Sequence, residues 1–379
     1  MFIGIQVEVE GIDDIEYSAS SIEAEFLNYE PDLEHVKEAA QEHGKENLIV
    51  IGEESLVTAF RAIFHAFLPE IDVDVSIVTL PDPDHLHSLS TSFKAENTVV
   101  MPVMGSKNYA PTVESLLFFL NRDYDVFAIC SDQENLLKSI AEQKDIPSIE
   151  HSSSAEGFVG GSEAALAPAA FAGLDVSRIR EGIRKSYNNM SSGDNAALHF
   201  ASALQSADGK GRSQILNLIY STRLLGVQPF IASLFHRASG ENSSHIQGGS
   251  ALKKRYAELA HEEDVLPLLL GTESFEKRTL KADDSIRDLN LRDYDLKNLD
   301  SFDISESLKS EYHGMKDALK HDDIPHISLN VTDHGYRSVG ELVGFIHCSM
   351  AYLADMRDAD MSGFSSEELR QRSLDRRFL

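Results

Sequence analysis

The amino-acid sequence predicts an α/β protein made of two three-layer αβα units with mainly parallel sheets, followed by a C-terminal helix. Short apolar runs alternate with helix-length amphipathic stretches through residues 1–150, and the same alternation returns in residues 151–356. Strands buried on both faces of a parallel sheet read as continuous apolar runs, and each needs a crossover helix before the next. With 379 residues the chain is also long enough for two domains of about 150 residues each.

The first unit is expected over residues 1–150, with an N-terminal extension. Residues 1–10 alternate like a strand, and residues 32–43 form an acidic helix. Ser55 is expected to cap the helix that begins at Leu56, and Pro83 stands near the first position of another helix. Further strands are predicted at 47–52, 73–79, 99–104 and 125–130, and helices at 56–67, 82–89, 113–120 and 135–143.

The Ser- and Gly-rich residues 150–162 mark the domain boundary, and residues 151–356 form the second unit. A strand at 264–271 is expected although it contains Pro267, which cannot donate to a strand ladder. Residues 273–303 are acidic and irregular, with room for one edge strand, and residues 357–379 form a tail with a charged helix over 365–376. The remaining strands are predicted at 214–220 and 326–331, and the helices at 163–172, 176–187, 195–207, 226–239, 250–259, 304–319 and 339–356.

The charge balance excludes some classes of partner. Sixty-two acidic residues against 34 Lys and Arg give a net charge of −28, which disfavours nucleic acids and anionic membranes. The acids are spread along the chain and Trp is absent, which suggests a cytoplasm of high salt, where screening weakens self-repulsion. No apolar run reaches the length of a membrane span, and the N-terminus lacks the basic region of a signal peptide, so a cytoplasmic location is expected.

Two cysteines, Cys130 and Cys348, stand in apolar contexts and provide no framework for disulfides or zinc. We therefore expect buried thiols in a reducing compartment, and neither a metal nor a cofactor.

Residues 99–115 are the stretch most suggestive of a ligand. An apolar strand ends at Gly105, a polar loop with Ser106 and Lys107 follows, and an apolar helix begins after Thr112. A helix N-terminus at the end of a strand binds phosphate through unpaired N–H groups and the helix dipole. The alternative is an ordinary turn between a strand and a helix, with Thr112 as the N-cap. In a parallel sheet this loop and the one at 52–55 would lie on the same edge.

Eight short segments of the sequence, by their order and spacing, resemble the phosphoglucose isomerase family, which is built from two sugar-isomerase (SIS) domains. The resemblance runs from about residue 45 to about residue 360. These segments lie at 48–55 (LIVIGEES), 82–86 (DPDHL), 106–115 (SKNYAPTVES), 160–168 (GGSEAALAP), 171–175 (FAGLD), 195–198 (NAAL), 220–226 (YSTRLLG) and 339–343 (VGELV).

The resemblance implies two SIS domains and an aldose–ketose isomerase that interconverts glucose 6-phosphate and fructose 6-phosphate. It places the substrate phosphate at Ser55, Ser106, Lys107 and Thr112. It assigns ring opening to His261, if one residue is inserted in the alignment. It also implies a homodimer in which this histidine is donated across the interface.

The chain departs from the family at the positions that carry the chemistry. Arg237 stands where the family has the glutamate that transfers a proton, and an arginine cannot act as a base near neutral pH. Glu241 is the nearest carboxylate in the sequence and is the tentative base, with Glu263 and Glu54 as alternatives. Ser162 replaces an arginine of the family, and Glu368 falls at the position of its closing lysine.

The sequence therefore leaves two functions open. The first is an active isomerase with a remodelled site. The second is a catalytically inactive SIS protein that binds a sugar phosphate or a partner subunit. Two carboxylates, Glu53 and Glu54, stand in the family's glycine-rich phosphate loop, and at close range each could cost on the order of 1 kcal/mol of phosphate affinity.

Overall fold

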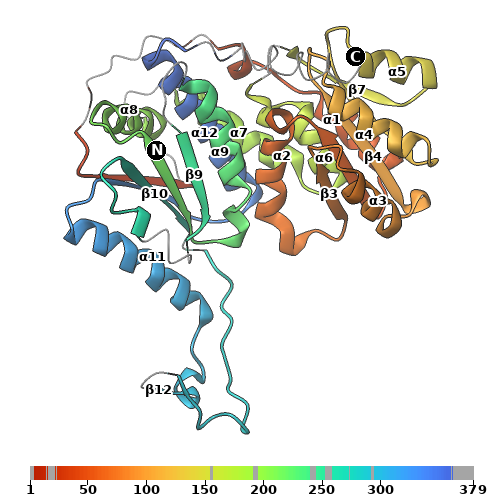
Figure 1. Ribbon diagram of the computed structural model, residues 1–379. Helices are drawn as coiled ribbons and strands as arrows, with labels where there is room; N and C mark the ends of the chain where they lie inside the picture. Colours follow the sequence, from red (N-terminus) through yellow and green to blue (C-terminus); the bar gives the residue numbers. More distant parts are fainter. Residues whose placement is uncertain are drawn as a thin grey trace.

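The computed structural model describes residues 4–13, 15, 22, 24–153, 157–190, 195–239, 245–251, 258–272, 274–291, 294–359 and 361. Two sheets lie at opposite sides of a layer of helices (Figure 1). The α/β class and the mainly parallel sheets that the sequence predicts are confirmed.

The first sheet is parallel and comes from the first half of the chain. Its strands run in the order β3 (Asp74–Val78), β2 (Asn47–Gly52), β4 (Thr98–Met104), β6 (Ala128–Ser131) and β7 (Ser148–His151), with β5 (Asp125–Val126) paired to β4. β2 and β4 are central and almost wholly buried, as their apolar sequences predict.

Helices cover both faces of this sheet. The outer face packs against α3 (Pro83–Ser92), α4 (Ala110–Leu120) and α5 (Leu136–Lys144), and the inner face against α1 (Leu33–His43), α2 (Glu54–Phe67) and α6 (Glu163–Phe171). The Asp82 carboxylate accepts from the N–H groups of Asp84 and His85, and Pro83 follows as the first residue of α3. The helix start predicted there is confirmed.

The second sheet runs in the order β1 (Ile5–Glu10), β13 (His326–Val331), β10 (Val265–Thr272), β8 (Gln214–Ile219) and β9 (His245–Ser250). All its pairings are parallel except that of β1 with β13. β10 is a central strand in spite of Pro267, and its ladder with β13 begins one residue later, at Leu268.

One face of the second sheet packs against α11 (Ile304–His321), and the other faces the layer that contains α7 (Val176–Asn189), α8 (Ala196–Gly209), α9 (Val227–Ala238) and α12 (Tyr336–Met356). α7 and α12 cross at glycines, because a Cβ on Gly182 would lie 2.0 Å from the carbonyl oxygen of Arg337. Short 3-10 helices complete the fold: η1 (Glu25–Leu27), η2 (Leu68–Glu70), η3 (Ala95–Asn97), η5 (Val159–Gly161), η6 (Thr222–Leu224) and η7 (Leu296–Leu299).

The two halves exchange elements across the expected boundary. β1 pairs with the second sheet, although residues 1–10 were expected as an extension of the first unit. α6, expected in the second unit, packs against α1, α2 and strands of the first sheet. Alternation of side chains predicts that a segment is a strand, but it carries no information on which sheet the strand joins.

Several local expectations are corrected. Glu53, rather than Ser55, is the N-cap of α2, and Tyr109, rather than Thr112, is the N-cap of α4. The edge strands β7 and β9 are not among the predicted strands. The tail helix at 365–376 lies outside the described residues, as does most of the helix at 250–259.

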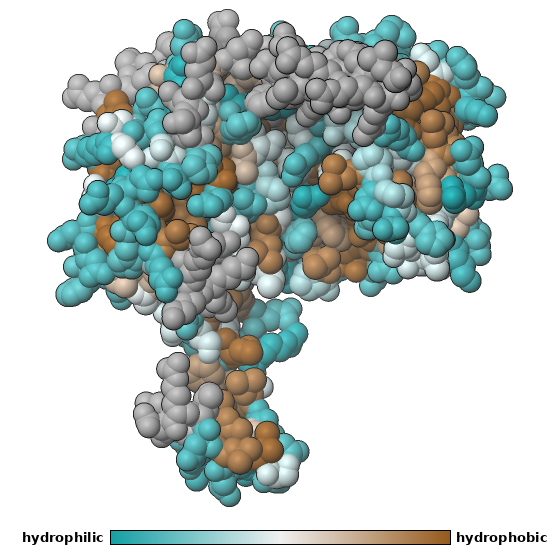
Figure 2. Space-filling model, viewed as in Figure 1, coloured by the Kyte–Doolittle hydropathy of each residue, from teal (hydrophilic) through white to brown (hydrophobic). Residues whose placement is uncertain are grey.

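Residues 274–304 leave the body of the second half and return to α11 as an extended arm, which contains β11 (Asn290–Leu291) and β12 (Tyr294–Asp295) (Figure 1). Apolar side chains are visible on its surface in the space-filling view (Figure 2). The sequence predicts irregular structure here but not the projection.

Candidate functional site

A cleft of about 600 Å³ lies between the two halves of the molecule. One wall comes from the carboxyl edge of the first sheet, and the other from α9 and the start of β9. Ligands of open parallel sheets bind at this edge. Its lining residues are Glu53, Glu54, Ser55, Thr79, Leu80, Tyr109, Gln228, Pro229, Ala232, Ser233, Phe235, His236, Arg237, His245 and Ile246.

The first wall is centred on the N-terminus of α2, which follows directly on β2. Glu53 is the N-cap and its carbonyl oxygen accepts from the N–H groups of Leu56 and Val57, at 2.9 and 3.2 Å. Glu54 is the first residue of the helix and its side chain is exposed. Carboxylates are stabilised by the positive end of the helix dipole, so both glutamates suit this position electrostatically.

The second wall is the polar face of α9. The apolar side chains of this helix are buried at 227, 230, 231, 234, 235 and 238. The positions between them, Gln228, Ser233, His236 and Arg237, face the cleft. This division follows from the helical repeat, so the sequence pattern separates a polar face of α9 from its buried face, although it does not indicate what the polar face meets.

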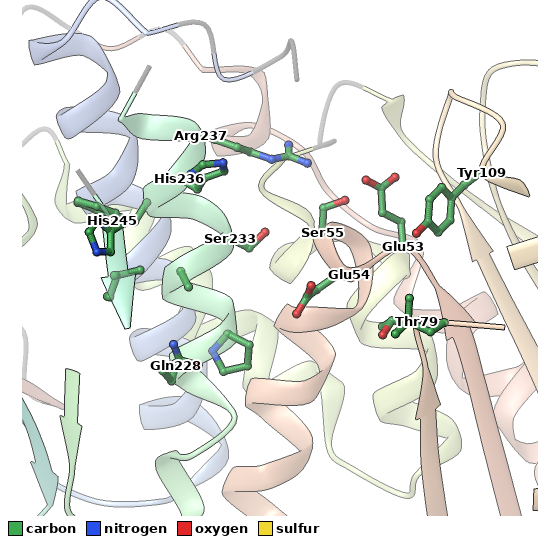
Figure 3. A pocket seen from close by; sticks show the side chains of 15 residues that line it. Glu53, Glu54, Ser55, Thr79, Tyr109, Gln228, Ser233, His236, Arg237 and His245 are labelled. Carbon is green, nitrogen blue, oxygen red and sulfur yellow. The ribbon is translucent and has the colours of Figure 1, made fainter. Parts of the chain in front are cut away.

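Charges of opposite sign meet across the cleft (Figure 3). The Glu54 side chain is directed toward α9, and Glu53 lies next to Tyr109. From the other side, Arg237 extends toward the first half, and the Ser233 hydroxyl points toward Ser55. Arg237 is the one Lys or Arg among the described residues that line the cleft. The site can therefore offer carboxylate acceptors for hydroxyl groups and a guanidinium for an anion.

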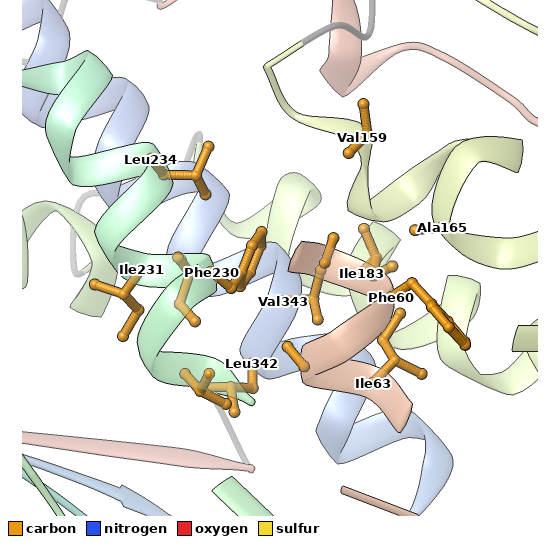
Figure 4. Close-up of a cluster of buried hydrophobic side chains, with 14 of the residues drawn as sticks. Phe60, Ile63, Val159, Ala165, Ile183, Phe230, Ile231, Leu234, Leu342 and Val343 are labelled. Atoms are coloured by element: carbon orange, nitrogen blue, oxygen red, sulfur yellow. The ribbon is translucent and has the colours of Figure 1, made fainter. Parts of the chain in front are cut away.

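The base of the cleft is part of the shared hydrophobic core. Phe60 and Ile63 of α2 belong to the same buried cluster as Phe230 and Ile231 of α9 (Figure 4). The backbones also approach closely here, since a Cβ on Gly226 would lie 2.5 Å from the carbonyl oxygen of Arg61. The two walls are thus joined by tightly packed helices.

The four residues expected to bind phosphate do not all lie in the cleft. Ser55 lines the cleft, whereas Ser106, Lys107 and Thr112 are absent from its described lining residues. Lys107 is exposed on the loop before α4, and Tyr109 is the residue of this loop that reaches the cleft. The loop is attached to α5 through Asn108, whose side-chain oxygen accepts from the Leu136 N–H at 2.6 Å.

Thr112 is buried at the N-terminal turn of α4, and Ser115 lies one turn further on the same face. Neither hydroxyl has a hydrogen-bond partner within the part of the chain that the structure describes. Unpaired buried donors are uncommon and call for an explanation. Both side chains are closed off from solvent, and neither is among the lining residues of the cleft.

Of the two residues expected in catalysis, only His261 lies in the described part of the chain, and it is absent from the lining residues of the cleft. His261 is exposed before the start of β10, and its Nε2 lies 3.1 Å from the Asp322 carboxylate. Glu241 lies outside the described residues. Ser162, which stands at the family's arginine position, is buried and donates to the Val159 carbonyl oxygen at 2.8 Å.

A buried polar cluster lies at the junction of the two halves. The Tyr29 hydroxyl donates to the Glu163 carboxylate at 2.6 Å, and the Tyr187 hydroxyl lies 2.7 Å from Nδ1 of His347. Burial, with a smaller effect of the nearby Arg180 charge, lowers the pKa of His347 to about 3. The imidazole is therefore neutral at physiological pH.

Three further observations bear on the sequence predictions. Both cysteines are buried, and burial raises the pKa of the Cys130 thiol to about 12. Across the described ranges, no group of three or more His, Cys, Asp or Glu side chains is arranged to hold a metal ion. None of the described helices combines the length and the apolar character that a membrane crossing requires.

Comparison with solved structures identifies the architecture. A hypothetical protein from Thermus thermophilus superposes with a TM-score of 0.82 at 18% identity, over 93% of this chain and 89% of the other. A glucose-6-phosphate isomerase from Chlamydia trachomatis superposes with a TM-score of 0.74 at 14% identity, over 97% and 81%. The chain has a double SIS-domain fold.

A smaller similarity extends to the tagatose-6-phosphate ketose/aldose isomerase of Escherichia coli, with a TM-score of 0.55 at 10% identity over 88% and 90% of the two chains. Neither protein-family models nor curated protein sequences give a match. At these identities the comparisons establish the double SIS-domain fold and no more.

Proposed function

We propose that this protein binds a sugar phosphate in the interdomain cleft and interconverts its aldose and ketose forms, with glucose 6-phosphate and fructose 6-phosphate as the pair to test first. The observation that carries the proposal is the meeting of carboxylates from α2 with a guanidinium from α9 across one cleft. The double SIS-domain fold shared with sugar-phosphate isomerases supports it.

Aldose–ketose isomerisation moves a proton between two neighbouring carbons of the open-chain sugar. A carboxylate removes the proton from C2 of the aldose and returns it to C1, while the carbonyl oxygen at C1 is protonated and the hydroxyl at C2 becomes the carbonyl. The negative charge of the intermediate enediolate needs a hydrogen-bond donor or a cation nearby. No oxidant, reductant or further reactant is consumed.

Within the cleft we assign the base to Glu54. Its carboxylate is directed toward α9 and across the space where a sugar would lie, whereas Glu53 lies beside Tyr109. Arg237 is the group placed to stabilise the enediolate or the phosphate, because its guanidinium stays charged and donates from a planar fork. The arginine that stands at the family's base position therefore takes the role of the cation in this proposal.

The ring-opening step needs an acid–base group that can exchange a proton near neutral pH. His236 lines the cleft next to Arg237 and suits this role by residue type. His261 would serve only if a second chain brought it to the cleft of its partner, since in its own chain it lies beside Asp322.

The experiment measures turnover and binding on the same variants. In multimolar KCl, the wild-type protein should interconvert the two hexose phosphates, and glucose 6-phosphate should raise its melting temperature. Glu54→Gln should lose at least about 100-fold in turnover while keeping the ligand-induced thermal shift, because general-base catalysis contributes about 10²–10⁴-fold. Glu142→Gln, an exposed glutamate of α5, is the matched control and should change neither quantity.

A second function, sugar-phosphate binding without turnover, is favoured by the positions at which the chain departs from the isomerase family. Arg237 and Ser162 replace two of the family's catalytic side chains, and Ser162 is buried in a backbone hydrogen bond. A thermal shift with glucose 6-phosphate, with no turnover above the blank at any salt concentration, would select this function. Absence of both turnover and thermal shift would contradict the sugar-phosphate site itself.

A further inference from the structure

The guanidinium of Arg237 ends against the backbone of the junction segment, by which we mean residues 157–162 between the two halves. A Cβ built on Gly157 would lie 2.9 Å from Nη1 of Arg237. Carbon atoms in contact with other heavy atoms normally lie about 3.5–4.0 Å away. The guanidinium therefore occupies space that is open only because residue 157 has no side chain.

The backbone of Gly157 sets a second requirement for glycine. Its φ angle is +98°, in the left-handed region that residues with a Cβ rarely adopt. Glycine is the usual residue where the backbone takes such a conformation and also approaches a functional group closely. The conformation and the contact with Arg237 thus select the same residue type.

The junction segment is anchored in the core directly after Gly157. Phe158 is buried and stacks on Phe26, with the ring centroids 4.1 Å apart. A Cβ on Gly160 would lie 2.5 Å from Cγ1 of Val343, so the backbone is tightly packed there as well. Closely packed interiors allow little movement. The backbone surface that Gly157 offers to Arg237 is therefore fixed by the core between the two halves.

The position of this one guanidinium matters for the cleft. Arg237 is partly buried, it extends from α9 toward the first half, and it faces a wall that carries Glu53 and Glu54 (Figure 3). An arginine side chain is long and loses rotamer freedom when it binds an anion, and a contact that restricts it beforehand reduces this cost. Whatever holds the guanidinium also decides where the anionic group of a substrate can lie.

We propose that Gly157 is a positioning residue for Arg237, and that the junction segment holds the guanidinium where it meets the anionic group of the substrate. This inference rests on the proposed function, because it requires a sugar phosphate in the cleft. The alternative is that Gly157 serves only the backbone conformation of the segment. In that case its substitution would lower stability and leave the cleft unchanged.

The test compares Gly157→Ala with Arg237→Gln in the full chain, by kcat and KM for glucose 6-phosphate and by the ligand-induced thermal shift. The atom that meets the new Cβ is the far end of a flexible side chain, so the arginine should shift and the fold should persist. Gly157→Ala should lose about 10-fold or more in kcat/KM, because a charge-assisted hydrogen bond to the substrate is misplaced. The loss should be divided between kcat and KM as it is in Arg237→Gln. For binding without turnover, the dissociation constant takes the place of KM.

The matched control is Gly173→Ala. Gly173 has a φ angle of +84°, and a Cβ built on it meets nothing within 4 Å. This variant introduces similar backbone strain without touching Arg237, so its melting temperature should fall while its kcat and KM stay those of the wild type. The double variant Gly157→Ala/Arg237→Gln should have the kinetics of Arg237→Gln alone, because no guanidinium remains to be displaced.

Wild-type kinetics and affinity in Gly157→Ala, with Arg237→Gln impaired, would overturn this inference and leave the proposed function intact. Additive losses in the double variant would overturn it in the same way. A wild type with neither turnover nor thermal shift would contradict the proposed function, and this inference with it. If Gly157→Ala does not fold, Gly157→Asn takes its place with the same expected results, because asparagine adopts positive φ more readily than alanine.

Discussion

Acidification should destabilise this protein through one buried imidazole, that of His347. The ring lies in the core between the halves, with the rings of Phe26, Phe158 and Phe230 centred 5.8, 5.4 and 5.5 Å away. Its Nδ1 lies 2.7 Å from the Tyr187 hydroxyl, and its Nε2 has no hydrogen-bond partner among the residues that the structure describes. Both ring nitrogens of a protonated imidazole are donors, so protonation would leave the Nε2–H without an acceptor among these residues.

The size of the effect follows from the pKa in the two states. Burial and then the Arg180 charge lower the pKa of His347 from 6.5 to about 3 in the folded protein, while the unfolded chain keeps the higher value. Between these two values the unfolded state binds the extra proton, so stability falls as the pH falls. From pH 7 to pH 5 the loss from this one group is ~2 kcal/mol, and it is complete near pH 3.

The assay is urea denaturation at pH 7 and pH 5, followed by circular dichroism. His347→Gln removes the titration and keeps a group that can reach Tyr187, so its free energy of unfolding should fall ~2 kcal/mol less than that of the wild type over this interval. His85→Gln, at an exposed position on α3, is the control and should follow the wild type. The same pH dependence in His347→Gln and the wild type would refute the reasoning.

Three further outcomes are expected. Gly340→Ala should strongly lower the melting temperature, because its Cβ would lie 2.0 Å from the Ile179 carbonyl oxygen, whereas Gly314→Ala, with nothing within 4 Å, should stabilise α11 by ~0.5–1 kcal/mol. If Lys107 binds the substrate phosphate, Lys107→Ala should abolish the thermal shift by glucose 6-phosphate, and an unchanged affinity would exclude this role. His261→Ala should slow turnover sharply if a partner's cleft uses this histidine, and full activity would show that it does not.

The sequence predicts where the strands and helices lie better than it predicts which of them pair or pack together. Apolar runs and the Asp82–Pro83 helix start have local causes, so the central strands and α3 are found at the expected places. Sheet pairing is not local, and β1 joins β13 at the other end of the chain. β9 has too few apolar residues to be recognised. Its close pairing with β8 needs a glycine at position 248, where a Cβ would lie 2.0 Å from the Asn217 carbonyl oxygen.

The candidate site is also predictable from the sequence only in part. The loop at the end of β4 could be found from its strand–loop–helix pattern, and Ser55 from its place after β2. The facing wall could not be placed, because which helix meets this edge depends on how the second half packs on the first. In the sequence Arg237 marks only the absence of the family's base, and its position across the cleft from the N-terminus of α2 suggests the role of a cation.

The packing beneath the cleft bears on how it would bind a ligand. α2 carries Glu54 and α9 carries Arg237, and both helices pack in one buried layer that includes Phe60 and Phe230. The spacing of the two helix backbones that carry the charged groups is therefore set before a ligand arrives, and preorganisation of this kind reduces the cost of binding. Phe230→Ala should lower stability by about 3–5 kcal/mol and weaken sugar-phosphate binding with it. If Phe230→Ala remained folded with full affinity, the walls of the cleft would be shown to be independent of this core.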